Sequence, residues 1–362
     1  MIAEWAILIS LAKCLIIIGL ILMVVPGMLF LERRGSAWMQ NRLGPNRLGP
    51  FGTLQGIADA VKLIFKEDFT PEHVHKFFYA IAPFVCMLPS LMTFAVIPFA
   101  APIVIDGQTL TFQVADLDVG VLYIMAIVSL GVYGIMMGGW SANSKYSMLG
   151  ALRSSSQMIS YELSMGLSLV AMLMVYSTVQ LNTICAVQGE AFFTIAGFTI
   201  PRWGFLLQPI AFLVFLTSTY AETNRLPFDL PEGESEIVAG YHLEFGSMKF
   251  ASFMLAEYSN MFTAAGLTTA LFFGGWQLLP GMGWLYAKLG LSGTAAIWGL
   301  AAFQAAAFLA KVGLFMWLFV LVRWTLPRFR YDQVMDLGWK ILLPLSLANL
   351  MVTAILIYGG VL

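Results

Sequence analysis

Eight long apolar runs dominate the sequence, and they constrain the fold more than any other feature. A helix needs about 20 mostly apolar residues to cross the hydrocarbon core of a bilayer. Runs of that length lie at about 4–31, 77–100, 119–140, 156–177, 204–223, 251–275, 295–324 and 339–360. They lack the short alternating period of a membrane β-barrel strand. We therefore predict an all-α membrane protein in which residues 1–362 form a single polytopic membrane domain with about eight transmembrane helices.

The scarcity of charge supports this prediction and excludes several classes of protein. Hydrophobic residues make up 59% of the chain and charged residues 11%, whereas a soluble domain is near a quarter charged. The net charge of −1 provides no overall field that would attract nucleic acid. Cys14, Cys86 and Cys185 lie too far apart to form a metal-binding or iron–sulfur motif. We therefore expect no metal site and no nucleic-acid partner.

The basic residues predict how the spans are oriented, because Lys and Arg accumulate in cytoplasmic loops. Only Arg202 and Lys288 fall in the even-numbered loops, and Lys13 and Lys311 fall within spans. The odd-numbered loops and their flanks carry 15 of the 19 basic residues: Arg33, Arg34, Arg42, Arg47, Lys62, Lys66, Lys76, Lys145, Arg153, Arg225, Lys249, Arg323, Arg328, Arg330 and Lys340. We therefore expect these loops to face the cytoplasm or an equivalent compartment, and both termini to lie on the periplasmic side.

The loop between the first two spans has an unusual pattern. The steps Gly44-Pro45 and Gly49-Pro50 favour turns rather than helix. In residues of about 52–67, apolar residues then recur at helical spacing and polar residues occupy the other face. This pattern predicts an amphipathic helix that lies along the membrane surface on the cytoplasmic side. Such a helix could be a simple surface anchor. Alternatively, it could form the lip of a cavity that holds the polar head of an amphipathic ligand.

The loop of about 222–250 is strongly acidic. Five acidic residues lie within fifteen positions, with apolar residues such as Phe228 and Tyr241 interleaved. A solvated acidic loop is the usual interpretation, but this segment is too apolar to be simply exposed. Carboxylates that are close together in a poorly hydrated site cannot all ionise, so their titrations couple. Such a cluster could hold and transfer protons.

Ionisable residues also occur within the spans. Three acidic residues, Glu162, Glu222 and Glu257, lie in or at the ends of spans four to six. Two basic residues, Lys13 and Lys311, also lie within spans. An ionisable residue in a membrane span is by default a functional candidate. Alternatively, any one of them could form a structural ion pair, such as a glutamate with Lys311. The residues thus indicate a ligand cavity at the membrane interface that is coupled to an acidic relay.

The two loops also resemble a known family. One motif is Glu32-Arg33-Arg34 followed by Met39-Gln40-Asn41-Arg42-Leu43-Gly44-Pro45-Asn46 and Gly49-Pro50-Phe51-Gly52. The other is Arg225-Leu226-Pro227-Phe228-Asp229-Leu230-Pro231-Glu232-Gly233-Glu234-Ser235-Glu236 with Ala239-Gly240-Tyr241. Both resemble the quinone-site membrane subunit of respiratory complex I (NADH:quinone oxidoreductase), which is the H subunit in bacteria and subunit 1 in mitochondria. The resemblance covers essentially the whole chain.

This resemblance implies a membrane subunit of an enzyme with no activity on its own. It would form the chamber for ubiquinone or menaquinone, which is the substrate, and would couple quinone reduction to proton translocation. No cofactor would be covalently bound to this chain, because the NADH site, FMN and iron–sulfur clusters belong to partner subunits. The expected partners are the peripheral-arm quinone-site and cluster-bearing subunits, small membrane subunits, antiporter-like subunits and the lipid bilayer. The expected location is the bacterial cell inner membrane, or an organelle inner membrane if the gene is organellar.

The resemblance also implies two groups of functional residues, none of them catalytic in this chain. The quinone chamber and its entrance would include Glu32, Arg33, Gln40, Arg42, Asp59 and Phe228. The proton relay and coupling residues would be Tyr161, Glu162, Glu222, Arg225, Asp229, Glu232, Glu234, Glu236 and Glu257.

Other functions remain open at this point. The equivalent subunit of a membrane-bound hydrogenase or formate hydrogenlyase has a similar scaffold, but the full Gln40-to-Asn46 motif favours the quinone enzyme. A stand-alone proton-coupled transporter is another alternative, although no clear internal repeat of spans supports it. A purely structural membrane anchor would leave the acidic loop unexplained.

Overall fold

The computed structural model describes residues 6–105, 107–195, 198–230, 240–279, 282–288, 290 and 293–360, and these are mostly helical. The longer helices are α1 (Ala6–Met39), α3 (Lys76–Met92), α4 (Gly120–Ser141), α5 (Lys145–Tyr176), α8 (Pro209–Glu222), α9 (Ser247–Phe272), α11 (Thr294–Thr325) and α13 (Leu343–Tyr358). The shorter ones are α2 (Gln55–Phe65), α6 (Leu181–Val187), α7 (Gly204–Leu207), α10 (Met282–Ala287) and α12 (Tyr331–Asp336). Short 3₁₀ turns cover Pro50–Gly52 and Thr93–Ala95, and a π-helical turn at Leu337–Leu342 joins α12 to α13.

Two small antiparallel hairpins complete the described secondary structure. Strands β1 (Ile103–Ile105) and β2 (Gln108–Leu110) pair with Val104 opposite Thr109. Strands β3 (Ala191–Ile195) and β4 (Phe198–Pro201) pair with Thr194 opposite Thr199, and their register shifts between Ala191 and Phe193. Both hairpins connect helices and contribute little to the core.

Six helical segments within the described ranges are long and apolar enough to cross a membrane. They are Ile7–Met39, Lys76–Ala95, Gly120–Ser141, Lys145–Tyr176, Thr294–Thr325 and Tyr331–Tyr358. Helix α8 is apolar but has only 14 residues. Helix α9 has 26 residues, and its polar content, which includes Lys249 and Glu257, keeps it out of this group. The chain is thus a multi-pass helical membrane protein, while the count of eight spans stays a prediction.

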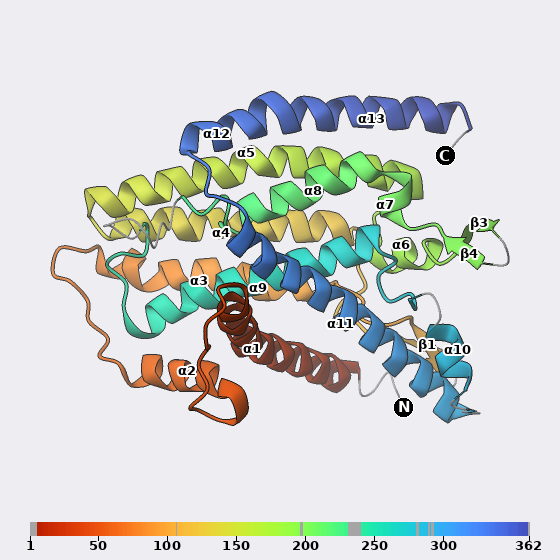
Figure 1. The fold of residues 1–362 in the computed structure, drawn as a ribbon, viewed down its shortest axis with the longest axis horizontal. Coiled ribbons are helices and arrows are strands. Elements are labelled where there is room, and N and C mark those ends of the chain that lie inside the picture. The colour runs from red at the N-terminus through yellow and green to blue at the C-terminus, as the bar shows by residue number, and fades with distance from the viewer. Residues whose placement is uncertain are drawn as a thin grey trace.

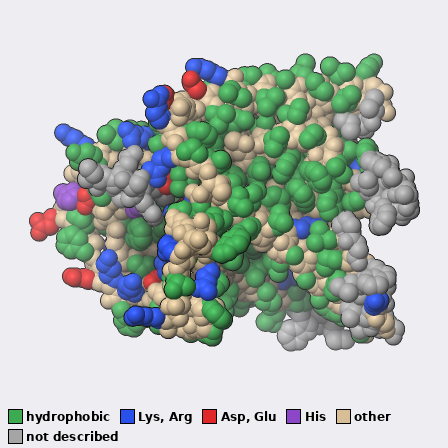
Figure 2. Space-filling model, viewed as in Figure 1, with side chains coloured by type: hydrophobic (Ala, Val, Ile, Leu, Met, Phe, Trp, Pro, Cys, Tyr) green, Lys and Arg blue, Asp and Glu red, His purple; other side chains and the backbone are tan. Residues whose placement is uncertain are grey.

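The long helices lie roughly side by side (Figure 1). Helix α13 is at one edge of the bundle next to α5, and α1 is at the opposite edge next to α11 and α9. The described ends of the chain lie at the same end of the bundle as both hairpins, while α2 and its connection to α3 lie toward the other end. Figure 2 shows hydrophobic side chains over most of this face and most of the charged side chains at the end that carries α2.

Helix α9 runs through the middle of the bundle. It packs against α1, α2, α3, α8 and α11, and nearly every residue from Ala256 to Phe272 is buried. Its carboxyl end is stabilised by the Lys311 amine, which lies 2.6–3.0 Å from the carbonyl oxygens of Phe273, Gly275 and Gln277. A cation at a helix carboxyl terminus is favourable because it meets the negative end of the helix dipole. In the structure, the charge of Lys311 is therefore met by backbone carbonyls.

Several element boundaries differ from those predicted. Helix α5 begins at Lys145, eleven residues before the predicted start, because residues 145–155, which precede the apolar run, continue the same helix. The last predicted span is the end of a longer helical segment that begins at Tyr331. Helix α2 covers Gln55–Phe65, which is shorter than the predicted 52–67. The residues between Met39 and α2 contain turns, as the two Gly-Pro steps predict.

Candidate functional site

A cavity of about 700 Å³ lies between α1, α2 and α9, and it is also bounded by the chain that follows α8 and by the end of α11. Apolar side chains come from the three helices: Leu22, Val25, Pro26, Leu29, Gly56, Ala60, Leu63, Ile64, Met248, Phe250, Ala251, Met254 and Leu255. Polar and charged lining residues are Glu32, Arg33, Ser36, Arg42, Asp59, Asn224, Arg225, Asp229, Glu257, Tyr258 and Arg323. Leu226 and Trp324 complete the wall. The cavity is thus lined by both apolar and charged side chains.

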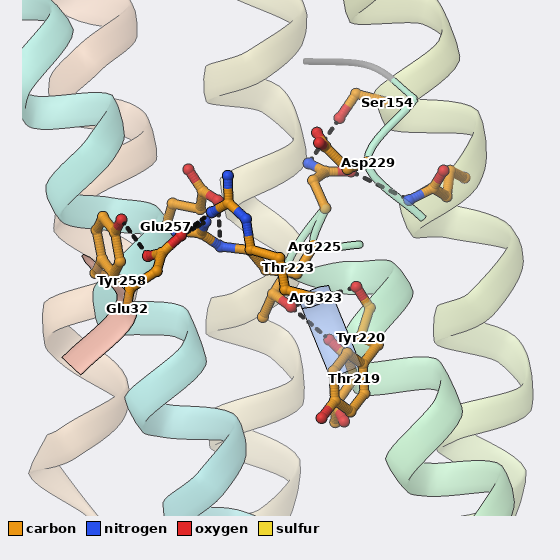
Figure 3. A network of polar contacts seen from close by, with 12 residues as sticks. Glu32, Ser154, Thr219, Tyr220, Thr223, Arg225, Asp229, Glu257, Tyr258 and Arg323 are labelled. Carbon is orange, nitrogen blue, oxygen red and sulfur yellow. Dashed lines mark hydrogen bonds and ion pairs between the residues drawn. The ribbon is translucent and has the colours of Figure 1, made fainter. Parts of the chain in front are cut away.

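Glu32 is the point at which four elements meet in the charged wall (Figure 3). It lies near the end of α1, and its Oε1 atom accepts a short contact from Arg323 of α11 and lies 3.6 Å from Arg225 Nη1. Its Oε2 atom accepts a hydrogen bond of 2.8 Å from the hydroxyl of Tyr258 on α9. Both oxygens of this carboxylate are therefore occupied by groups from other parts of the chain.

Arg225 connects Glu32 to a second carboxylate. Its Nε atom lies 2.7 Å from Glu257 Oε1, and its guanidinium carbon lies 4.5 Å from the centre of the Tyr258 ring. Glu32, Arg225, Glu257 and Tyr258 are each less than a tenth exposed. With Arg323, the network balances two carboxylates against two guanidinium groups, as charges buried this deeply require.

The position of Arg225 follows from how α8 ends. Its backbone N–H donates to the carbonyl of Tyr220, which closes the last turn of α8. The buried amide of Gln157 on α5 lies 2.8–3.2 Å from Ala221 O, Asn224 Oδ1 and Phe228 O. One side chain of α5 thus orders the segment that carries Arg225.

Asp229 lies a short distance along the same segment. Its Oδ2 atom accepts a hydrogen bond of 3.0 Å from Arg328. Burial raises the pKa of the Asp229 carboxyl, while Arg328, Arg323 and Arg225 oppose this shift. Desolvation penalises the charged form and nearby cations favour it, so the charge of Asp229 depends on these arginines.

A further ion pair links α1 to α2 at the cavity wall. Arg33 Nη1 lies 2.5 Å from Asp59 Oδ2, and Lys62 Nζ lies 3.6 Å from Asp59 Oδ1. Gln55 also donates to Asp59 over 3.3 Å. The Asp59 carboxylate therefore faces the cavity with its partners on α1 and α2.

The residues predicted for the quinone chamber fall into two sets. Glu32, Arg33, Arg42 and Asp59 line the cavity. Gln40 and Phe228 do not appear in its wall. Gln40 accepts a hydrogen bond of 2.7 Å from Arg42 Nε, so it contacts a lining residue. Phe228 is buried instead between the rings of Tyr161 and Phe329, with ring centres 5.3 and 5.6 Å away.

The residues predicted for the relay also divide. Arg225, Asp229 and Glu257 line the same cavity as Glu32, so the two predicted groups meet in one network. Glu162 on α5 accepts a short hydrogen bond from Ser129 on α4, and Glu222 lies near enough to interact with it electrostatically. The remaining positions are Tyr161, whose hydroxyl donates to Val334 O over 2.8 Å, and Glu232, Glu234 and Glu236, which lie outside the described residues.

Sequence reasoning missed two members of the network. Tyr258 follows Glu257 directly, and a polar aromatic residue beside an acid in a membrane span was the available signal. Arg323 was counted only as a basic residue that sets orientation. Its pairing with Glu32, which is 291 residues away, leaves no mark in the sequence pattern. In the part of the chain that the structure describes, no three His, Cys, Asp or Glu side chains converge as metal ligands.

Comparisons with known proteins agree on one family. The family model described as NADH dehydrogenase matches residues 12–354. The chain is 44% identical over 367 residues to the NADH-quinone oxidoreductase H subunit of Bdellovibrio bacteriovorus, covering 96% of this chain and 95% of that protein. It is 46% identical over 324 residues to the protein of the same name from Flavobacterium psychrophilum, covering 90% of each chain. The H subunit numbered 2 from Geobacter sulfurreducens is 44% identical over 344 residues, covering 94% of each.

Proposed function

The chain belongs to the NADH dehydrogenase family, and we propose that it forms the quinone chamber of a proton-pumping NADH:quinone oxidoreductase. It is a membrane subunit of an enzyme complex, as the resemblance predicted. The relatives are named for quinone reduction by NADH, and the cavity between α1, α2 and α9 is the place in this chain where a quinone can bind. The match to the family model and the identity to the relatives confirm the predicted family.

The single observation that carries this proposal is the lining of the cavity, which combines apolar side chains with a network of charged ones. A quinone has a polar ring with two carbonyl oxygens and an apolar isoprenoid tail. Leu22, Leu63 and Met254 are among the side chains suited to the tail. The network of Glu32, Arg225 and their partners offers charged and polar groups near the ring. The cavity volume of about 700 Å³ is typical of a site that encloses a ligand of this size.

Quinone reduction requires two electrons and two protons. The charged residues in the cavity wall lie where they can respond to this change. The electrons come from NADH through cofactors on partner subunits. Taking up protons at the quinone changes the charge that Glu32, Arg225 and Glu257 experience. Because Arg225 lies 3.6 Å from Glu32 and 2.7 Å from Glu257, this change is transmitted along the network. We propose that it reaches Glu162 and Glu222 through the acidic segment after α8, and then the antiporter-like subunits.

The arrangement in the membrane follows from the same proposal. The chain would be one polytopic domain of the cell inner membrane, with the charged end of the bundle on the cytoplasmic side. Helix α2 exposes Ile57, Val61 and Phe65 away from the cavity, with exposed fractions of 50%, 46% and 85%. An exposed apolar face is suited to the lipid interface. The peripheral-arm subunits would contact the loops at this end.

Blocking the cavity tests the proposal. Ala251 lines it, so Ala251→Trp should reduce NADH:quinone reductase activity of the assembled complex by at least about tenfold, the effect of a barrier increase near 1.4 kcal/mol. Electron transfer from NADH to a water-soluble acceptor should be unchanged, because it occurs on partner subunits. Ala12→Trp, on the exposed face of α1, is the matched control. Normal quinone reduction by an assembled Ala251→Trp complex would refute the proposal.

A further inference from the structure

The two ends of α2 are attached to the bundle in different ways. Near its amino end, Gly56 packs so closely against α1 that a Cβ atom there would lie 2.9 Å from Pro26 Cβ and 3.1 Å from Pro26 O. The ion pair of Asp59 with Arg33 strengthens this contact. Backbone atoms leave no space for adjustment, so this end of α2 is held by close packing to α1.

The carboxyl end of α2 is linked to α9 through a hydroxyl group. Ser247 Oγ lies 3.1 Å from the carbonyl oxygen of Leu63 and 2.9 Å from that of Lys66. The last carbonyls of a helix have no partner within it. The Ser247 hydroxyl shares its hydrogen between two of them and so links the end of α2 to the start of α9.

Lys249 adds a second link, to the segment that follows α2. Its amine lies 3.0 Å from Asp68 Oδ1 and 3.1 Å from Thr70 Oγ1, and 5.0 Å from the centre of the Tyr79 ring. The Lys249 side chain is 17% exposed, whereas Asp68 is 58% exposed. Unlike the packing of Gly56, these contacts are few and polar, and they lie at the boundary with water.

The backbone of Ser247 indicates that its contact is specific. Its φ angle is +53°, in the left-handed region that is costly for a residue with a side chain. Glycine would adopt it freely, but glycine has no hydroxyl to reach Leu63 and Lys66. A left-handed serine whose hydroxyl meets two helix carbonyls supports a role for this side chain in holding α2.

We propose that Ser247 and Lys249 fasten the carboxyl end of α2 to α9 and thereby act as positioning residues that set the selectivity of the cavity for the length of the quinone tail. This inference rests on the proposed function. Helix α2 contributes Ala60, Leu63 and Ile64 to the apolar wall. A long tail needs this wall in place along its length, whereas a quinone with a short tail uses less of it. Loosening α2 therefore weakens the binding of long-tailed quinones in particular.

Three variants test this in the intact complex. Ser247→Ala removes the hydroxyl and retains the backbone cost, Ser247→Gly removes both, and Lys249→Met removes the amine while keeping an apolar stem. Ser252→Ala is the matched control, because Ser252 lies on the same helix and its hydroxyl donates within α9 to Met248 O. Hydrogen exchange of the α2 amides in purified complex measures the attachment. Kinetics with a long-tailed and a single-isoprenyl quinone in proteoliposomes measure selectivity.

We expect faster exchange in α2 for all three variants and no change for Ser252→Ala. The KM for the long-tailed quinone should rise about three- to tenfold, which is the effect of losing roughly one net hydrogen bond. The KM for the short-tailed quinone and both kcat values should stay near wild type. Unchanged exchange, or a change in Ser247→Ala that Ser247→Gly does not share, would overturn the fastening role. Faster exchange with an unchanged ratio of KM values would overturn the selectivity.

Failure of the proposed function gives a different result. In that case Ala251→Trp would leave quinone reduction intact, while the exchange measurements would still report whether Ser247 and Lys249 hold α2.

Discussion

The hydroxyl of Tyr258 donates a 2.8 Å hydrogen bond to Glu32 Oε2, while the other oxygen of Glu32 forms ion pairs with Arg225 and Arg323. The ring of Tyr258 also lies beneath the Arg225 guanidinium. One aromatic side chain therefore contacts both an anion and a cation of the cavity wall. Because Tyr258 is neutral, it can orient these groups without changing the charge balance of the network.

Tyr258→Phe should separate these two contacts. The phenyl ring keeps its position beneath Arg225, but Glu32 loses the donor to Oε2. A buried group without its partner costs about 1–3 kcal/mol, so kcat/KM for quinone reduction should fall by about tenfold, with assembly intact. Steady-state NADH:quinone reductase assays on membranes measure this effect.

Tyr220→Phe is the control for that substitution. Tyr220 is buried, and its hydroxyl has no hydrogen-bond partner among the residues that the structure describes. Removing this hydroxyl should leave activity unchanged. Equal losses in both variants would mean that the phenol group of Tyr258 has no particular role.

The ion pair between Arg225 and Glu257 should behave as a coupled unit. Breaking a buried pair leaves an uncompensated charge and costs about 3–5 kcal/mol, so Glu257→Gln and Arg225→Gln should each strongly reduce the stability of the complex. The double variant should lose less than the sum of the two, with a coupling energy of about 1–3 kcal/mol. Thermal inactivation of the purified complex, analysed as a double-mutant cycle, measures it.

The exposed pair of Asp336 and Lys340, at 2.8 Å, provides the comparison. Its side chains are 60% and 71% exposed, and exposed pairs contribute little. The cycle of Asp336→Asn with Lys340→Gln should show almost no coupling. A buried pair that couples no more strongly than this one would contradict the assigned network.

Arg328→Met should make stability more dependent on pH. Burial already raises the pKa of Asp229, and removing Arg328, which opposes that shift, raises it further. A carboxyl whose folded pKa exceeds its unfolded value favours the fold below the unfolded pKa and loses that contribution as the pH rises through the folded pKa. The stability of the variant should therefore be closest to that of wild type at acidic pH. As the pH rises, its free energy of unfolding should decrease relative to wild type, by about 1.4 kcal/mol for each unit by which the pKa of Asp229 is further raised.

Melting temperatures of the complex across its stable pH range measure this dependence. In the double variant Asp229→Asn with Arg328→Met no carboxyl remains to ionise, so the additional dependence on pH should disappear. Persistence of the dependence in the double variant would assign it to another group.

Glu234→Gln and Glu236→Gln test the acidic segment that lies outside the described residues. Because neighbouring carboxylates share protons as a coupled set, losing one should reduce quinone reductase activity or the number of protons moved per NADH by several-fold. Proton uptake and NADH oxidation measured together in proteoliposomes distinguish these two effects. Glu190→Gln, beside β3 at the end of the bundle that carries the hairpins, is the control. Wild-type rates and wild-type pumping would remove these residues from the mechanism.

The helical fold could be predicted because a bilayer imposes a simple rule. Every backbone group must be satisfied within the hydrocarbon, so apolar runs of sufficient length become helices. The long apolar runs indeed became helices, and the two Gly-Pro steps lie in the connection between the end of α1 at Met39 and the start of α2 at Gln55. Ends such as Lys145 were harder to predict, because a helix can continue beyond the apolar run into the polar interface.

The cavity could be predicted only in part. Glu32, Arg33 and Arg42 were identified from their motif and Asp59 from the family resemblance, and all four line the cavity. Tyr258 and Arg323 were missed, and Phe228 lies in the packed interior instead. A sequence pattern reports the neighbours of a residue along the chain, whereas the wall of a cavity brings together elements that are far apart in it.

From the amino-acid sequence alone follow the membrane setting, the helical class, the expected orientation and the family, because each depends on local composition or on contiguous motifs. Which charges meet depends instead on how α1, α9, α11 and the segment after α8 pack against one another. Glu32 shows the difference most clearly. Its partners come from positions 225, 258 and 323, and packing of the helices, rather than any local preference, brings these side chains to one carboxylate.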